Sequence, residues 1–186
     1  MLKCGKNIIQ DKSVITIEEL DIKDIDKYIM FVEDVKEKME HKEWLGDFKK
    51  EDYEYLLSNG SVIYIWKIKE EIIASGMLIP ATQKDLIKFN LEELDVLKTM
   101  DLGPEMVKEK YRGNGLQKDV LVYLLDYCKK EGFTNAITTI HPDNSYSINN
   151  AEKVEFKRVG VKTFKRGERI IFLKNIIQFF IYLNFF

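Results

Sequence analysis

The stretch Val107-Lys-Glu-Lys-Tyr-Arg-Gly-Asn-Gly115-Leu-Gln117 decides how the rest of the chain is interpreted, because a strand-like run turns there into a long amphipathic helix through two glycines. Glycine lets the backbone come close to a ligand, and the first N–H groups of a helix have no partner inside it. The helix dipole adds partial positive charge at the same end. The stretch predicts an anion cradle, and a tight connection without a ligand is the alternative.

The hydrophobic periodicity on both sides of the cradle predicts a mixture of helices and strands. A strand at residues 100–108, a helix at 115–130 and a strand at 133–140 imply a parallel crossover pair. The pattern before them predicts a strand at 14–17, helices at 22–39 and 50–58, a hairpin of 62–68 with 72–79, and a short helix around 91–97. The pattern after them predicts a helix at 145–154 and a hairpin of 156–164 with 168–173. Gly76 inside a strand predicts a bulge or a close approach of another segment.

The composition fits one globular domain, which we expect at residues 1–175. The chain has 186 residues, of which 45% are hydrophobic and 32% charged, and its formal net charge is −2. That balance leaves no electrostatic footprint for nucleic acid, so any phosphate recognition must be local. Two distant cysteines show no metal or redox spacing, and the start of the chain lacks the apolar core of a secretory signal. We therefore expect a cytoplasmic protein without a metal.

Residues 176–186 form an apolar C-terminal tail that stands apart from this composition. The tail is too short to span a bilayer, which takes about 20 apolar residues. A packed terminal strand or helix is one interpretation. A homodimer contact or an anchor at a membrane surface is the other.

Two familiar phosphate-binding schemes do not fit the cradle. A P-loop needs Lys and then Ser or Thr after its last glycine, whereas Leu116 and Gln117 follow Gly115. A dinucleotide-binding turn needs a third glycine or alanine at position 118, which is Lys118. A pyrophosphate arm held by backbone amides is the remaining scheme.

The stretch resembles the central acyl-CoA motif of the GNAT superfamily of N-acetyltransferases, Arg/Gln-x-x-Gly-x-Gly/Ala, between the expected strand and helix. Asn144 matches an Asn that commonly contacts the CoA arm, and Phe156 matches the Phe of a terminal Gly-Phe pair. The element order over about residues 13–174 is also similar. The resemblance implies an α+β, GNAT-like fold with a central mixed β-sheet flanked by helices.

The chain departs from the family pattern at three positions. Gln117 replaces the final Gly/Ala, which is tolerable where only its backbone N–H is used, and Glu155 replaces the Gly before Phe156. Ala151 stands where many members have a Tyr that protonates the departing thiolate. Tyr146 lies nearby and is the predicted substitute, with a packed helix residue as the alternative interpretation.

The resemblance implies attack of a primary amine on the thioester carbonyl of acetyl-CoA. A carboxylate would accept the proton of the amine, and Glu105 is the first candidate, with Asp101 second. Backbone N–H groups near Met106, Val107 and Lys108 would stabilise the developing oxyanion. Arg112 or Lys118 would add charge. The predicted cofactor-binding residues are Met106, Val107, Arg112, Gly113, Asn114, Gly115, Leu116, Gln117, Asn144 and Ser147.

The sequence thus predicts an acetyltransferase that moves an acetyl group from acetyl-CoA to a primary amine of a small molecule or peptide. Its acceptor pocket would be built from the first two helices, the 81–99 segment and the final hairpin. A non-catalytic module that binds acyl-CoA or a protein partner on the same fold is the alternative, because Ala151 stands at the acid position.

Overall fold

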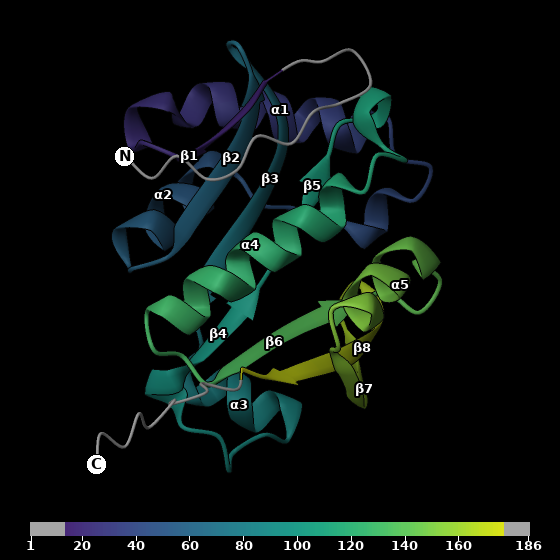
Figure 1. Cartoon of the computed structure of the whole chain (residues 1–186). Helices are drawn as coiled ribbons and strands as arrows, with labels where there is room; N and C mark the ends of the chain where they lie inside the picture. Colours follow the sequence, from purple (N-terminus) through teal and green to yellow (C-terminus); the bar gives the residue numbers. More distant parts are fainter. Residues whose placement is uncertain (1–13, 177–186) are drawn as a thin grey trace, which may run out of the picture.

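The computed structural model describes residues 14–176, which form one mixed β-sheet with helices on both faces (Figure 1). The strand order is β1-β2-β3-β4-β6-β8-β7, and β5 pairs with β3 beside β4. The strands are β1 Ile15–Glu19, β2 Val62–Ile68, β3 Glu71–Pro80, β4 Thr99–Leu102, β5 Met106–Val107, β6 Asn135–Ile140, β7 Lys157–Phe164 and β8 Gly167–Asn175. The helices are α1 Ile25–Glu37, α2 Lys50–Ser58, α3 Gln83–Phe89, α4 Leu116–Lys130 and α5 Ser145–Lys153, with short 3₁₀ turns η1 Ile22–Asp24, η2 Lys42–Trp44, η3 Val96–Lys98 and η4 Glu109–Tyr111. The predicted fold class is confirmed.

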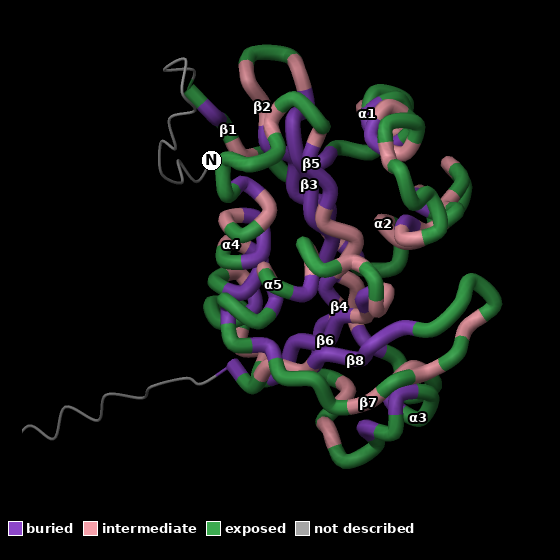
Figure 2. Tube along the Cα trace, turned by 90° about the vertical axis from the view of Figure 1, so that its right-hand side faces the viewer, coloured by how far each residue is buried: buried purple, intermediate pink, exposed green. Residues whose placement is uncertain are grey.

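Alternation along the strands sends side chains to two different cores. Ile63 and Ile65 of β2 pack with α1 and α2, whereas Tyr64 and Trp66 face the side of α4. In Figure 2, α1 and α2 lie on the side of the sheet opposite to α4 and α5, and the buried residues concentrate in the strands between them. A third cluster, around Ile171, packs under α3.

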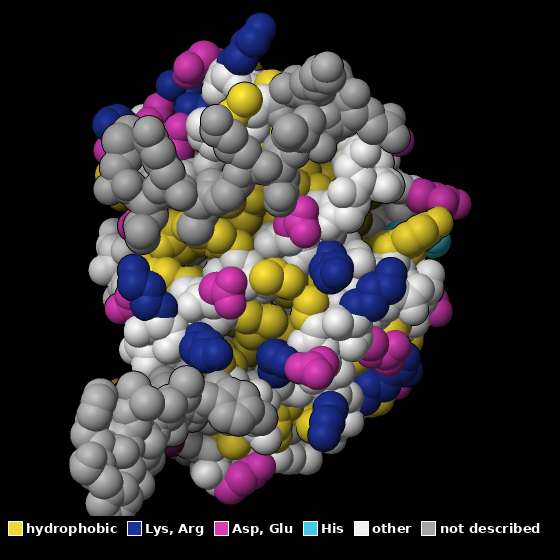
Figure 3. Space-filling model, in the orientation of Figure 1, with side chains coloured by type: hydrophobic (Ala, Val, Ile, Leu, Met, Phe, Trp, Pro, Cys, Tyr) yellow, Lys and Arg dark blue, Asp and Glu magenta, His cyan; other side chains and the backbone are white. Residues whose placement is uncertain are grey.

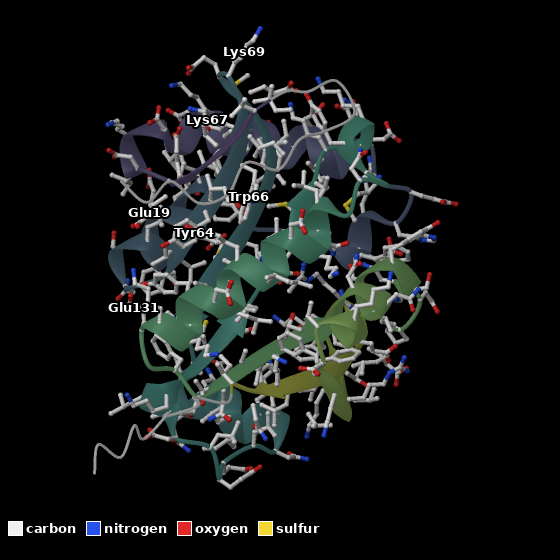
Figure 4. The ribbon with its side chains drawn as sticks, viewed as in Figure 1. Glu19, Tyr64, Trp66, Lys67, Lys69 and Glu131 are labelled. Carbon is white, nitrogen blue, oxygen red and sulfur yellow. The ribbon has the colours of Figure 1, made fainter. Side chains whose placement is uncertain are left out.

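Two contacts fix the direction of α4, whose first turn is the predicted cradle. Gly76 of β3 lets the helix come close, because a Cβ there would lie 2.5 Å from Val120 and 2.8 Å from Leu124. The bulge of this hairpin lies instead between Trp66 and Lys67, so Gly76 marks a close approach. In the same middle part of α4, the ring centroid of Tyr64 lies 4.9 Å from that of Tyr123, and Figure 4 labels Tyr64 and Trp66 on β2.

The sheet opens between β5 and the second half of β6. β4 pairs in parallel with β6 only from Thr99 to Asp101. The chain then leaves the ladder at Pro104, which has no N–H to donate, and continues as β5 on β3. β6 continues alongside β8 as far as Ile140. The single strand predicted at 100–108 is therefore wrong, since two short strands with a break between them occupy this stretch.

The helix predicted around residues 91–97 is also wrong, because α3 lies earlier. Thr82 caps the helix by accepting a hydrogen bond from the Asp85 N–H, and the Asp85 carboxylate accepts one from the Thr82 N–H. Asn90, in the left-handed conformation at φ 58°, ends it. Residues 96–98 form only the short turn η3.

The core of the domain, predicted at residues 1–175, extends to residue 176. Ile176, which the sequence analysis places in the tail, is buried in the core, and its N–H donates to the Thr134 carbonyl. Residues 177–186, with the predicted dimer contact, lie outside the described residues, as do residues 1–13.

Candidate active site

The cradle has the backbone conformation that its glycines suggest. Gly113 has a φ of 81° and Gly115 a φ of 76°, and a Cβ on either would meet no atom within 4 Å. Gly115 is the N-cap of α4, and the first intrahelical bond runs from the Asp119 N–H to its carbonyl. The N–H groups between them, in the first turn, have no acceptor within the helix. The Asn114 amide braces the turn by donating to the carbonyls of Tyr111 and Arg112.

Hydrogen bonds join the cradle to the segment that holds Asn144 and Ser147. The Asn144 side chain caps α5 by accepting from the Ser147 N–H at 3.1 Å. The Gln117 amide donates to the Ser147 hydroxyl at 3.0 Å and accepts from the Asn150 amide at 2.9 Å. The Gln117 side chain therefore links α4 to α5, a role that the sequence analysis missed because it considered only the backbone of this residue.

The backbone of Val107 borders the opening in the sheet. The Lys108 N–H donates to the Ile73 carbonyl, and Val107 lies opposite Ala74. Because the polar groups of an antiparallel strand alternate in direction, those of Val107 point away from β3. The Val107 carbonyl accepts a hydrogen bond from Arg112 Nε at 3.3 Å, which places it on the side of the cradle. Of the N–H groups predicted at 106–108, that of Lys108 is thus committed to β3.

Met106 occupies the opposite position in the ladder. It lies opposite Ser75, so its backbone polar groups point toward β3. The side chains of Met106 and Val107 are buried on opposite faces of the sheet, in the two main hydrophobic clusters. The backbone of Val107 is therefore the part of β5 that a ligand in the opening could reach.

Of the two candidate bases, Glu105 lies in the break between β4 and β5, and Asp101 lies within β4. Glu105 Oε1 is buried and has no hydrogen-bond partner among residues 14–176. Burial raises the pKa of Glu105 to about 7. Burial, together with the negative charges of Asp85 and Glu105, raises the pKa of Asp101 to about 8. Both carboxyls therefore titrate near neutral pH, the range in which a general base works best.

The structure does not bring Tyr146 to this group. Tyr146 is 77% exposed on α5, whereas Ala151 is 1% exposed in the core beneath the same helix. Five residues along an α-helix turn the side-chain direction by about 140°, so the two positions face different sides of α5.

The connection between α1 and α2 contacts the final hairpin through two arginines that the sequence analysis missed. Arg166 Nη1 donates to the Leu45 carbonyl at 2.9 Å, and Arg169 Nη2 donates to the Glu43 carbonyl at 2.7 Å. Arg169 is 7% exposed, and burial lowers its pKa. No spacing signal could have found these pairs, which join residues more than a hundred positions apart.

Trp44 lies in the connection that these arginines hold. Its ring centroid is 4.5 Å from that of His41 and 6.1 Å from that of His141 at the end of β6. Trp44 Nε1 is buried, and no described residue accepts a hydrogen bond from it. A polar donor thus lies unused between the first two helices and the final hairpin, where the sequence predicts the acceptor pocket.

The charges around the site follow no single sign. Figure 3 shows basic and acidic side chains interspersed over the face that carries α4. Among residues 14–176, no cluster of His, Cys, Asp and Glu could hold a metal ion, and no helix there is long and apolar enough to cross a membrane.

Comparison with known proteins identifies the family. Residues 29–156 match the model of the Acetyltransferase (GNAT) family, and the chain belongs to this family. Acetyl transfer is thereby the general class of reaction. None of the curated proteins matches the sequence significantly.

Solved structures share the fold at low sequence identity. An N-acetyltransferase from Staphylococcus aureus superposes with a TM-score of 0.69 at 15% identity, covering 89% of this chain and 100% of its own. The ribosomal-protein-S18-alanine N-acetyltransferase from Escherichia coli gives 0.68 at 15% identity, covering 92% and 100%. The Salmonella typhimurium protein yncA, solved with its cofactor acetyl-CoA, gives 0.65 at 14% identity, covering 88% and 95%.

Proposed function

We propose that the protein transfers an acetyl group from acetyl-CoA to a primary amine of a small molecule or peptide. The observation that carries this proposal is the opening between β5 and β6, which the outward-facing backbone of Val107 borders. The buried Glu105 carboxyl lies two residues earlier in the chain. The cradle at the start of α4 lies next in the chain. The same opening and cradle would suit the thioester and the pyrophosphate of one extended ligand.

The residues that would hold acetyl-CoA come from two helix starts. N–H groups at Gly115, Leu116 and Gln117 would donate to the pyrophosphate, with charge from Arg112 or Lys118. Asn144 and Ser147 would lie along the pantetheine arm, and the hydrogen bond from the Gln117 amide to the Ser147 hydroxyl joins them to the cradle. The left-handed glycines leave open space for such a ligand.

The chemistry would use the Glu105 carboxyl, the Val107 N–H and the Tyr146 hydroxyl. Glu105 would accept a proton from the acceptor ammonium, because a neutral amine is the nucleophile. The amine nitrogen would bond to the acetyl carbon as the bond from carbon to sulfur breaks. The Val107 N–H would stabilise the negative charge that develops on the carbonyl oxygen. Tyr146 stays the predicted proton donor to the thiolate, although its exposed side chain would have to turn inward.

Thiol release from acetyl-CoA across a panel of small amines and N-terminal peptides tests the proposal. Turnover with at least one amine, with the acetylated product confirmed by mass spectrometry, is expected. Calorimetry with CoA provides an independent arm, and no binding at millimolar CoA would contradict the proposal.

A non-catalytic module that binds acyl-CoA or a partner is the second candidate, because Ala151 is a core residue at the position of the usual acid. This candidate predicts CoA binding without thiol release for every amine. Steady turnover with any amine excludes it.

A further inference from the structure

One carboxylate holds the segment that joins the two halves of the proposed acetyl-CoA site. Residues 108–111 connect Val107, at the opening, to the cradle that begins at Arg112. Glu71, the first residue of β3, accepts hydrogen bonds from three side chains of this segment. The donors are Lys108 Nζ at 3.2 Å, Lys110 Nζ at 2.9 Å and the Tyr111 hydroxyl at 2.9 Å.

Lys108 extends this network to α1. Its Nζ lies 3.5 Å from an Asp34 oxygen, and the other Asp34 oxygen accepts from Lys38 Nζ at 2.6 Å. The side chains of Lys108 and Glu71 are only 20% and 33% exposed, and they line a hollow of about 170 Å³. One segment is therefore fastened to both a strand and a helix by charged groups.

The protonation state of Glu71 suits this task. Burial alone would raise the pKa of Glu71, but the hydrogen bonds from Lys110, Tyr111 and Lys108 outweigh burial and hold the pKa below its usual value. The carboxylate stays charged at neutral pH. Exposed single ion pairs contribute little to stability, whereas three donors on one acceptor constrain a short segment much more strongly.

We infer that Glu71 is a positioning residue for acetyl-CoA. Glu71 fixes the distance between the Val107 N–H and the cradle, so that both can contact one ligand. Residues 108–111 are then already ordered before the ligand binds. Affinity rises when a binding segment is ordered before the ligand arrives. The inference rests on the proposed function, since it concerns the ligand of that same site.

Glu71→Gln tests the inference, with Glu18→Gln as the matched control. Glu18 accepts from Lys67 Nζ at 3.3 Å, on neighbouring strands away from the cradle; Figure 4 labels Lys67 on β2. By calorimetry we expect Glu71→Gln to weaken CoA binding about tenfold, as the loss of one or two pre-ordered side chains would. The KM for acetyl-CoA should rise in parallel while kcat changes little. Glu18→Gln should change neither.

Hydrogen exchange supplies a readout that needs no ligand. Amides at 107–112 should exchange faster in Glu71→Gln than in the wild type, and Tyr111→Phe, which removes one of the three donors, should lie between them. Wild-type CoA affinity together with unchanged exchange in Glu71→Gln would overturn the inference. If the wild type binds no CoA, the proposed function fails, while the exchange at 107–112 still decides whether Glu71 holds the segment.

Discussion

Replacing Glu105 by Gln removes the proposed base while keeping the size of the side chain. Because burial raises the pKa of Glu105 to about 7, about half of the molecules carry the carboxylate at pH 7 and about one tenth at pH 6. A positioned general base contributes roughly 10²- to 10⁴-fold to a rate. We expect Glu105→Gln to lower kcat/KM at least about a hundredfold at pH 8 and to leave CoA binding unchanged.

The same substitution should stabilise the fold at high pH. The folded pKa of about 7 lies above the ordinary 4.5, so the folded protein binds more protons than the unfolded chain between these values. The contribution of Glu105 to stability is therefore fully present below about pH 4.5 and lost as the pH rises through about 7. At pH 8, ionisation of the buried Glu105 therefore costs the folded state at most about 3 kcal/mol. Gln does not ionise, so the variant should exceed the wild type in stability at pH 8 and match it at pH 4.

A pH profile of the rate and urea unfolding at two pH values test whether Glu105 is the base. The wild-type kcat/KM should rise with pH through an apparent pKa near 7, and Glu105→Gln should abolish this rise. Urea unfolding at pH 4 and pH 8 should show the gain in stability only at pH 8. Wild-type rates and pH profile in Glu105→Gln would refute the reasoning. If Asp101→Asn instead removes the activity, the base is Asp101.

Three further substitutions test other parts of the structure. Gly115 has a φ of 76°, so Gly115→Ala should cost about 1–2 kcal/mol in backbone strain and should weaken the CoA binding measured by calorimetry. Unchanged CoA binding would argue against a cradle at this turn. Arg169→Met keeps the bulk of the side chain but removes its hydrogen bonds to three carbonyls, so the free energy of unfolding measured in urea should fall by about 2–4 kcal/mol. The KM for the amine should rise, while the KM for acetyl-CoA should stay unchanged. Gly76→Ala should lower the free energy of unfolding by about 1–3 kcal/mol, since the new Cβ would lie 2.5 Å from Val120. The control Gly160→Ala, whose Cβ would have its nearest neighbour at 3.7 Å, should change the free energy of unfolding by less than about 0.5 kcal/mol. Equal effects of the two substitutions would contradict the packing of α4 on β3.

The glycine turn before α4 and several elements of the fold could be predicted from the sequence because their signals are local. Glycines, a helix start and an apolar stripe lie within a few residues of one another, and α2 begins and ends where its pattern predicts. Two errors in the predicted elements have local causes as well. The capping pair of Thr82 and Asp85 marked the true start of α3, and Pro104 marked the break in the strand.

The contacts between the final hairpin and the connection of α1 to α2 could not be predicted in the same way, because they join distant residues. Arg169 reaches the Glu43 carbonyl across 126 positions, and Arg166 reaches Leu45 across 121. A backbone carbonyl is present at every residue, so no residue type identifies the acceptor of such a bond. The three donors that meet at Glu71 are similarly 37 to 40 positions away from it.

The departures from the family pattern at positions 155 and 151 differ in their consequences. Glu155 has a φ of 66°, in the left-handed region that glycine occupies most readily, and it pairs with Lys174 at 2.9 Å. Phe156, the next residue, packs in the core at 3% exposure. Ala151 is different, because no change of backbone can replace a missing hydroxyl. Tyr146 faces another side of α5, so in the proposed reaction it could donate the proton to the thiolate only after moving. Tyr146→Phe should lower kcat if Tyr146 is the donor and leave kcat unchanged if solvent supplies the proton.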